Sequence, residues 1–215
     1  MTKPSLTLKL LLGLTSMLTV SAYAAPAVNA LPQGGVVSAG SAVISQSVGS
    51  NSAALTVNQS SQRAVIDWNS YNVGQNATVT YNQPNSQSST LNRISDPNVS
   101  QIFGQIKSNG EVVLVNPEGV YFSPSSSVNV GALVATTNNI SNSDYMNGKA
   151  TYTRGNASGS VVNEGNITAG LGRYVALLAP SVRNSGIIIA QMGTAVLASG
   201  DVITLNFNSG NHLAS

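Results

Sequence analysis

An internal repeat is the feature that most restricts how this chain can fold. The segment 161–169 (VVNEGNITA) aligns with the segment 182–190 (VRNSGIIIA) at an offset of 21 residues, 184 minus 163 for the matching Asn residues. A period of 20–50 residues indicates a solenoid. Since a strand rises ~3.3 Å per residue, a 21-residue unit provides roughly three short strands with their corners, which is one coil of a parallel β-helix. Further matches at this offset are Gly165 with Gly186, Gly172 with Gly193, Val175 with Val196, and Val182 with Ile203.

The rest of the chain also favours an all-β fold. Short apolar or alternating runs are separated by Asn, Gly, Ser and Pro, and almost no segment has the 3.6-residue period of a helix. Residues about 31–60 are less regular, and we interpret them as a partly antiparallel cap on the open end of the solenoid. The polar segment 138–159 interrupts the repeat. We expect a small hairpin around Asn147-Gly148, with Tyr145 and Tyr152 packed on the body.

The first 24 residues have the pattern of a Sec-type signal peptide. A basic start with Lys3 and Lys9 precedes a short apolar core, and Ala22-Tyr23-Ala24 predicts cleavage before Ala25. The alternative is a membrane anchor or a buried helix. However, the apolar core lacks the flanking charges that would stop its transfer through the membrane. Residues 25–215 are then one domain. Cleavage leaves seven of the nine basic residues against seven acidic ones, so charge gives no case for a nucleic-acid partner.

The composition is unusual for an enzyme. Charged residues make up 7% of the chain, against the ~25% typical of soluble domains, and Cys is absent. The single histidine, His212, lies near the C-terminus, and the aspartates do not recur at multiples of 21 residues. We therefore predict no catalytic activity, no cofactor and no metal site. A polysaccharide lyase, the enzymatic alternative, would need carboxylates gathered on one face.

Two turns enclose the apolar run 112–115 (VVLV). Ser108-Asn109-Gly110 precedes it and Asn116-Pro117-Glu118-Gly119 follows it. Gly tolerates positive φ, Pro presets φ near −65° and Asn bonds to its own backbone, so both sequences predict sharp corners. On geometry alone, Asn116 to Gly119 would be no more than a tight corner.

These residues also resemble a known family, the secretion domain at the N-terminus of filamentous-haemagglutinin and high-molecular-weight-adhesin exoproteins, exported by two-partner secretion. Asn116-Pro117-Glu118-Gly119 is similar to the family's Asn-Pro-Asn-Gly turn, with Glu118 replacing the second Asn. The family's Asn-Pro-Asn-Leu signature is missing, which resembles the adhesin branch. Asn92, Arg93, Gly104, Asn109 and Gly110 fall in other matching segments. These segments are 81–84 (YNQP), 91–94 (LNRI), 100–106 (SQIFGQI) and 130–137 (VGALVATT).

The resemblance implies a right-handed parallel β-helix that serves as a recognition domain for secretion. Its partners would be the Sec machinery and the periplasmic modules of an outer-membrane β-barrel transporter, and the protein would fold at the cell surface of a Gram-negative bacterium. We expect Asn116 to Gly119 to act in secretion or folding. The domain would lead a longer exoprotein, whose C-terminal passenger would bind any host-cell receptor or glycan. The alternative is a self-contained surface adhesin or matrix protein that binds through its solenoid face.

Arg93 has two interpretations in a chain so poor in charge. Asp67, Asp96 and Glu111 are its candidate partners, and an exposed ion pair with one of them would contribute little. Arg93 would otherwise anchor the cap or contact the transporter, and we favour the structural role.

Overall fold

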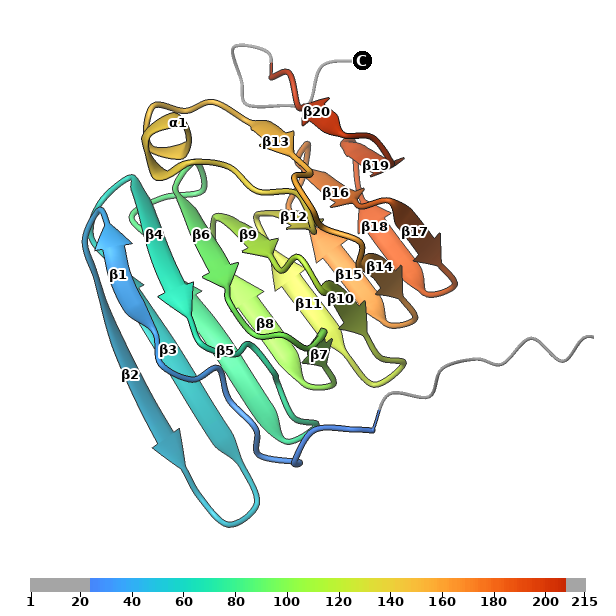
Figure 1. Ribbon diagram of the computed structural model, residues 1–215. Helices are drawn as coiled ribbons and strands as arrows, with labels where there is room; N and C mark the ends of the chain where they lie inside the picture. The colour runs from blue at the N-terminus through green and yellow to red at the C-terminus, as the bar shows by residue number, and fades with distance from the viewer. Residues whose placement is uncertain (1–23, 208–215) are drawn as a thin grey trace, which may run out of the picture.

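The computed structural model describes residues 24–207, which form a parallel β-helix (Figure 1). This confirms the predicted fold class. Three sheets run along the solenoid, and the middle coils add one strand to each. Sheet 1 consists of β1 (Val36–Ala39), β4 (Arg63–Trp68), β6 (Ser89–Ile94), β9 (Glu111–Val115), β12 (Ala132–Thr136), β16 (Tyr174–Leu178) and β19 (Thr194–Ala198).

The other two sheets complete each coil. Sheet 2 consists of β2 (Ala42–Val48), β3 (Ala53–Gln59), β5 (Ala77–Asn82), β8 (Gln105–Ser108), β11 (Ser127–Val130), β15 (Asn166–Ala169) and β18 (Ile187–Ala190). Sheet 3 consists of β7 (Ser100–Ile102), β10 (Gly119–Phe122), β14 (Ser160–Asn163) and β17 (Ser181–Asn184). The predicted signal peptide lies outside the described residues except for Ala24, and His212 lies outside them too.

Between the last two coils, the strand register confirms the offset of 21 residues in two sheets and corrects it in the third. Asn163 pairs with Asn184 in sheet 3, and Asn166 pairs with Ile187 in sheet 2. In sheet 1, however, Val175 pairs with Ala195 and not with Val196, an offset of 20. The corner between β18 and β19 is one residue shorter than the equivalent corner between β15 and β16. The match of Val182 with Ile203 was also wrong, because Ile203 lies outside the coils.

The cap contains antiparallel strands, as predicted. β1 runs antiparallel to β4, and β2 runs antiparallel to β3. β3 is already parallel to β5 and therefore belongs to the first coil. Trp68 and Tyr71 are buried here with their rings edge to face, 5.7 Å between centroids.

Apolar side chains form two clusters, one on each side of sheet 1. The first fills the interior of the coils, with Val112, Leu114 and Leu177 among its members. The second lies on the outer face and includes Val113, Val115 and Ala176 from neighbouring positions of the same strands. Both faces of β9 are thus buried, which explains why its sequence is continuously apolar and does not alternate.

The outer face of sheet 1 is covered by residues 138–159, which we call the strap. The strap contains α1 (Asn142–Met146) and β13 (Thr151–Thr153), and β13 pairs antiparallel with β20 (Val202–Thr204). Figure 1 shows the strap lying across β6, β9 and β12. The helix has five residues, so no helix of residues 24–207 is long enough to cross a membrane.

The hairpin predicted around Asn147-Gly148 was wrong. Ser141 caps a short helix by accepting a hydrogen bond from the backbone N–H of Asp144, and Gly148 follows the helix at a φ of 81°. An Asn-Gly pair serves a helix C-terminus as well as a hairpin turn, because both need positive φ. Tyr145 and Tyr152 are buried on the body, as predicted.

Candidate functional site

The turn at Asn116 joins β9 to β10, at the corner between sheets 1 and 3. The Asn116 carbonyl accepts a hydrogen bond from the Gly119 N–H at 2.9 Å, and the Asn116 Oδ1 accepts one from the Glu118 N–H, also at 2.9 Å. The Asn116 Nδ2 donates to the Asn98 carbonyl and to the Ser100 Oγ of the preceding coil. Asn116 is fully buried. One side chain therefore closes the turn and fixes it to the coil below.

Gly119 is required at the end of this turn. Its φ is 117°, and a Cβ built there would lie 2.5 Å from the Ser160 carbonyl oxygen of the next coil. Pro117 and Glu118 are exposed between the two buried ends. Only the backbone of Glu118 enters the hydrogen bonds of the turn, so a Glu fits where the family has Asn. The result is a rigid frame that presents two side chains.

Asn109 and Gly110 form the corner that precedes β9. The Asn109 side chain accepts from the Gln83 N–H at 2.8 Å and donates to the Gln83 carbonyl at 2.7 Å, as a neighbouring strand would. Gly110 lies against the Ser88 carbonyl, and Gly104 lies against the Gly74 carbonyl, each too close for a Cβ. These residues fix the spacing between coils.

Asn92 is the centre of a buried polar network inside the first coils. Its Oδ1 accepts hydrogen bonds from the Trp68 Nε1 at 3.0 Å and from the Tyr81 hydroxyl at 2.8 Å. Its Nδ2 donates to the Val113 carbonyl at 3.2 Å. The Tyr81 hydroxyl is 2.6 Å from that of Tyr71, and burial raises the pKa of both tyrosines well above its usual value. Asn92 thus links the capped end to the next coil.

Arg93 points to the opposite side of sheet 1, because successive strand residues face opposite ways. Its Nη1 lies 3.1 Å from the Asp67 carboxylate and 2.7 Å from the Asn142 Oδ1. Its Nη2 donates to the Ile140 carbonyl at 2.7 Å, and its Nε donates to Asn139 at 3.1 Å. Of the three expected carboxylates, only Asp67 pairs with it. Arg93 therefore holds the start of the strap against the coils.

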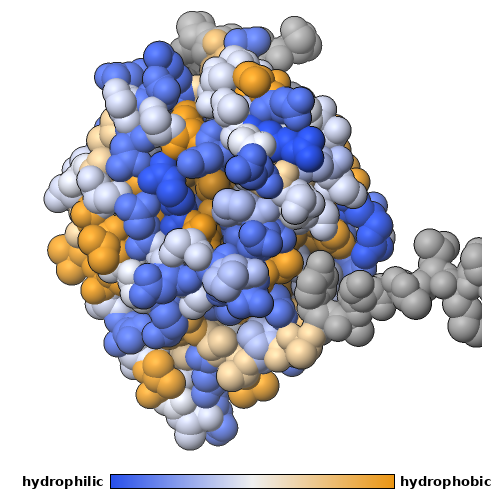
Figure 2. Space-filling view, viewed as in Figure 1, coloured by the Kyte–Doolittle hydropathy of each residue, from blue (hydrophilic) through white to orange (hydrophobic). Residues whose placement is uncertain are grey.

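The predicted residues do not gather in one pocket. Asn92 is interior, Arg93 lies under the strap, and the two turns occupy different corners. The outer surface around them is mixed. Figure 2 shows polar and apolar residues interspersed over the face seen in Figure 1, without one dominant apolar area.

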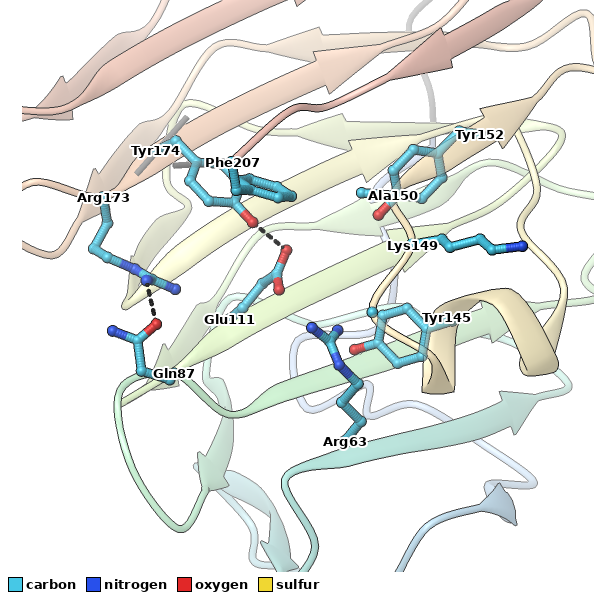
Figure 3. A pocket seen from close by; sticks show the side chains of 11 residues that line it. Arg63, Gln87, Glu111, Tyr145, Lys149, Ala150, Tyr152, Arg173, Tyr174 and Phe207 are labelled. Carbon is cyan, nitrogen blue, oxygen red and sulfur yellow. Dashed lines mark hydrogen bonds between the residues drawn. The ribbon is translucent and has the colours of Figure 1, made fainter. Parts of the chain in front are cut away.

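Sequence reasoning missed one polar cavity, which lies between the strap and sheet 1 (Figure 3). The Tyr174 hydroxyl donates to Glu111 at 2.6 Å, and the Arg173 Nη1 donates to Gln87 at 3.1 Å. The Arg63 guanidinium stacks over Tyr145 at 5.4 Å from the ring centroid. Burial and the nearby Glu111 charge raise the pKa of Tyr174. In a chain with so few charges, the Arg and Tyr residues were the available signal for this cavity. They are far apart in sequence, so the sequence did not show that they cluster.

The cavity is too small for an organic ligand. Its volume is about 30 Å³, and one water needs roughly 10–15 Å³ on the same measure. It therefore has room for about two or three waters and no more. Within residues 24–207, no group of three His, Cys, Asp or Glu is placed to bind a metal.

Similar sequences and a similar structure are found among proteins of Haemophilus influenzae. Two heme/hemopexin-binding proteins of Haemophilus influenzae are each 36% identical to this chain, over 178 residues (79% of the chain) and 111 residues (52%). This chain spans 19% and 12% of their lengths. The crystal structure of the HMW1 secretion domain from Haemophilus influenzae superposes with a TM-score of 0.74 at 30% identity, covering 81% of this chain and 46% of that one.

The family match covers nearly the whole described domain. Residues 30–214 match the TPS secretion domain. Proteins with this domain are two-partner secreted exoproteins of Gram-negative bacteria, and the domain implies a cognate outer-membrane transporter. The match includes the turn, the corner residues and the coils described above. The chain therefore belongs to the TPS secretion domain family, and it is the secretion domain of a two-partner secreted exoprotein.

Proposed function

We propose that this domain directs its exoprotein to the cognate outer-membrane β-barrel transporter and nucleates β-helix folding outside the cell. The signal peptide and the Sec machinery would deliver the chain to the periplasm, where the periplasmic modules of the transporter bind it. The family match over residues 30–214 is the observation that carries this proposal. Any binding of a host-cell receptor or glycan would belong to a passenger beyond this domain.

The turn from Asn116 to Gly119 is the first surface that we propose for recognition. Pro117 and Glu118 are exposed, while Asn116 and Gly119 are buried and fixed to the coils on both sides. Because the backbone of the turn is already fixed, little backbone entropy is lost when a partner binds there. The turn also joins two strands of one coil, so it can act in folding as well as in recognition.

The edge of the cap is the second proposed surface. β2 is seven residues long, and within the described part of the chain it pairs on one side only, with β3. Val43 and Val48 on this strand are more than 60% exposed. A long edge strand with exposed apolar residues invites pairing with another chain. A strand from a periplasmic module of the transporter could extend sheet 2 at this edge.

Export is the decisive experiment. The chain is expressed in a Gram-negative host with and without the transporter gene adjacent to its own, and the medium is assayed. We expect the protein in the medium only with the transporter. Periplasmic retention in both hosts would contradict the proposal and favour the self-contained adhesin.

A pair of matched variants tests the turn itself. Ser123 to Ser126 forms a second corner of the same kind, with buried ends, the exposed pair Pro124 and Ser125, and a Ser126 N–H to Ser123 carbonyl bond of 2.9 Å. We expect Pro117→Ala with Glu118→Lys to reduce transporter-dependent export about tenfold, the effect of losing a contact worth ~1.4 kcal/mol. Pro124→Ala with Ser125→Lys is the control, and it perturbs its own corner at least as much, because it also removes the hydrogen bond from the Ser125 Oγ to the Phe103 carbonyl at 2.8 Å. Equal export of the two variants would refute recognition at this turn.

A further inference from the structure

The strap is held at two places by different parts of the chain. Its first half is fixed by residues of early coils: Arg93 binds Asn139, Ile140 and Asn142, and Ser89 bonds to the Tyr145 hydroxyl. Its second half is fixed by residues 201–207, which we call the clasp. The two anchors are therefore separated by more than one hundred residues of sequence.

The clasp makes regular strand contacts with the strap. Thr151 pairs with Thr204, Tyr152 with Ile203 and Thr153 with Val202. Backbone hydrogen bonds extend this ladder at both ends, from the Arg154 N–H to the Asp201 carbonyl at 2.7 Å and from the Leu205 N–H to the Ala150 carbonyl at 3.0 Å. Arg154 and Asp201 also form an ion pair at 3.1 Å.

The second half of the strap has little local structure of its own. β13 is three residues long, and apart from β20 the described chain gives it only the single bridge between Asn139 and Thr153. An isolated pair of such short strands is marginal in water. The clasp also buries Leu205 in the outer cluster and stacks Phe207 on Tyr174, with ring centroids 5.1 Å apart. Phe207 also lines the polar cavity, so the clasp supplies part of its wall.

We propose that the clasp closes the strap in a separate step, after the coils have formed. Each coil needs only the preceding coil as a template, whereas the second half of the strap needs residues that follow the last coil, β17 to β19. If the chain emerges with its N-terminus first, the second half of the strap cannot close over the outer face of sheet 1 until residue 207 has emerged. The inference rests on the fold and does not depend on which surface the transporter recognises.

Hydrogen exchange on the full chain tests this step. Leu205→Asp places a charge in the outer cluster, where Leu205 is 7% exposed, while Val202→Asp places the same charge elsewhere in the clasp at a side chain that is 62% exposed. We expect Leu205→Asp to lower protection of the Arg154 amide, which donates to the Asp201 carbonyl of the clasp, at least about 100-fold, because an unpaired charge does not stay buried. The Asn116 amide, bonded to the Thr136 carbonyl in the coils, keeps its protection. Val202→Asp leaves both amides protected.

Two results would overturn the proposal. One is unchanged protection of the Arg154 amide in Leu205→Asp, which would mean that the clasp does not hold the strap. The other is an equal loss at the coil amides, which would mean that strap and coils open as one unit.

A crosslink provides the second test. The chain has no cysteine, so Thr151→Cys with Thr204→Cys introduces a single designed pair at facing residues whose hydroxyls are 3.0 Å apart. In the Leu205→Asp background, we expect oxidation to restore strap protection and reduction to abolish it again. Continued loss of protection in the crosslinked protein would show that the pairing of β13 with β20 is not what closes the strap.

Discussion

The coils and the strap of this domain are stabilised in different ways. In the coils, each strand pairs with strands about one repeat away, and the same alternation of inward and outward side chains recurs in each sheet. In the strap, a five-residue helix and a three-residue strand are held by side chains and by residues about 50 positions further along. The stability of the coils is therefore a sum of neighbour terms. The stability of the strap depends on a few distant contacts.

The largest effect should come from the network inside the coils. Asn92→Leu would leave the Trp68 N–H and the Val113 carbonyl without their Asn92 partner in a buried site. We expect a loss of about 3 kcal/mol in the free energy of unfolding, since each buried group that is left unsatisfied costs roughly 1–3 kcal/mol. Urea unfolding measures the change.

Asn129→Leu is the control for that substitution. Asn129 has the same side chain and is exposed on the outer face of sheet 2. We expect its replacement to alter stability by less than about 0.5 kcal/mol. Similar losses in both variants would mean that strand propensity, and not the buried network, determines the result.

Alkaline pH should weaken the attachment of the strap to the coils. Burial, followed by the Glu111 charge, raises the pKa of Tyr145 and Tyr152 above the usual value of 10.0. The opened strap would ionise near that usual value, so the stabilisation is complete below about pH 10 and is lost as pH rises further. Two such groups give about 2.7 kcal/mol per pH unit. Hydrogen exchange of the Arg154 amide, bonded to the Asp201 carbonyl, between pH 9 and pH 11, corrected for intrinsic rates, measures the effect.

Tyr152→Phe separates ionisation from other effects of base. The variant keeps the ring and removes one of the two ionisable groups, so we expect the pH slope to fall by about half, or ~1.36 kcal/mol per pH unit. An unchanged slope would assign the alkaline opening to other groups.

The same contrast explains what could be predicted from the sequence. The period of 21 was visible because Asn163, Gly165 and their counterparts occupy equivalent corners, and a corner tolerates few residue types. The strap was placed correctly at residues 138–159, and its buried tyrosines were identified. Its structure was not predicted, because Asn147-Gly148 ends a helix that begins at the Ser141 cap, and this cap is not part of a local hairpin pattern. The cavity was missed for the same reason, since its Arg and Tyr residues share no sequence spacing.

The sequence predicted which residues belong to the candidate site, but not how their side chains are arranged in space. Asn116 to Gly119 was correctly expected to be a sharp corner, and the burial of Asn116 follows from its bonds to the preceding coil. Whether a residue faces the interior or the strap required the register. Asn92 and Arg93 are adjacent in sequence, yet one bonds within the coils and the other anchors the strap.

Arg93→Met should loosen the strap without disturbing the coils. It removes hydrogen bonds to three strap residues, and we expect the first half of the strap to lose about 1–2 kcal/mol of local stability. The Tyr145 amide, bonded to the Ser141 carbonyl, reports on this half by hydrogen exchange. Arg183→Met is the control, because Arg183 pairs with Glu164 on the surface with its side chain 52% exposed. A comparable loss at Tyr145 in the control would contradict an anchoring role for Arg93.

The smallest expected effect concerns the place where the repeat shortens. Met192 has a φ of 54°, close to the 69° of Gly172 in the preceding coil, and its side chain is 84% exposed. A non-glycine residue in this region costs about 1–2 kcal/mol, of which the greater flexibility of unfolded Gly cancels roughly 0.5–1. Met192→Gly should therefore raise the free energy of unfolding by about 0.5–1 kcal/mol. Leu171→Gly makes the same change at an exposed corner residue without positive φ, and it should lower stability by a similar amount. Opposite signs in the two urea midpoints would show that the repeat loses one residue here at the expense of backbone strain, whereas equal signs would show that the shorter corner is unstrained.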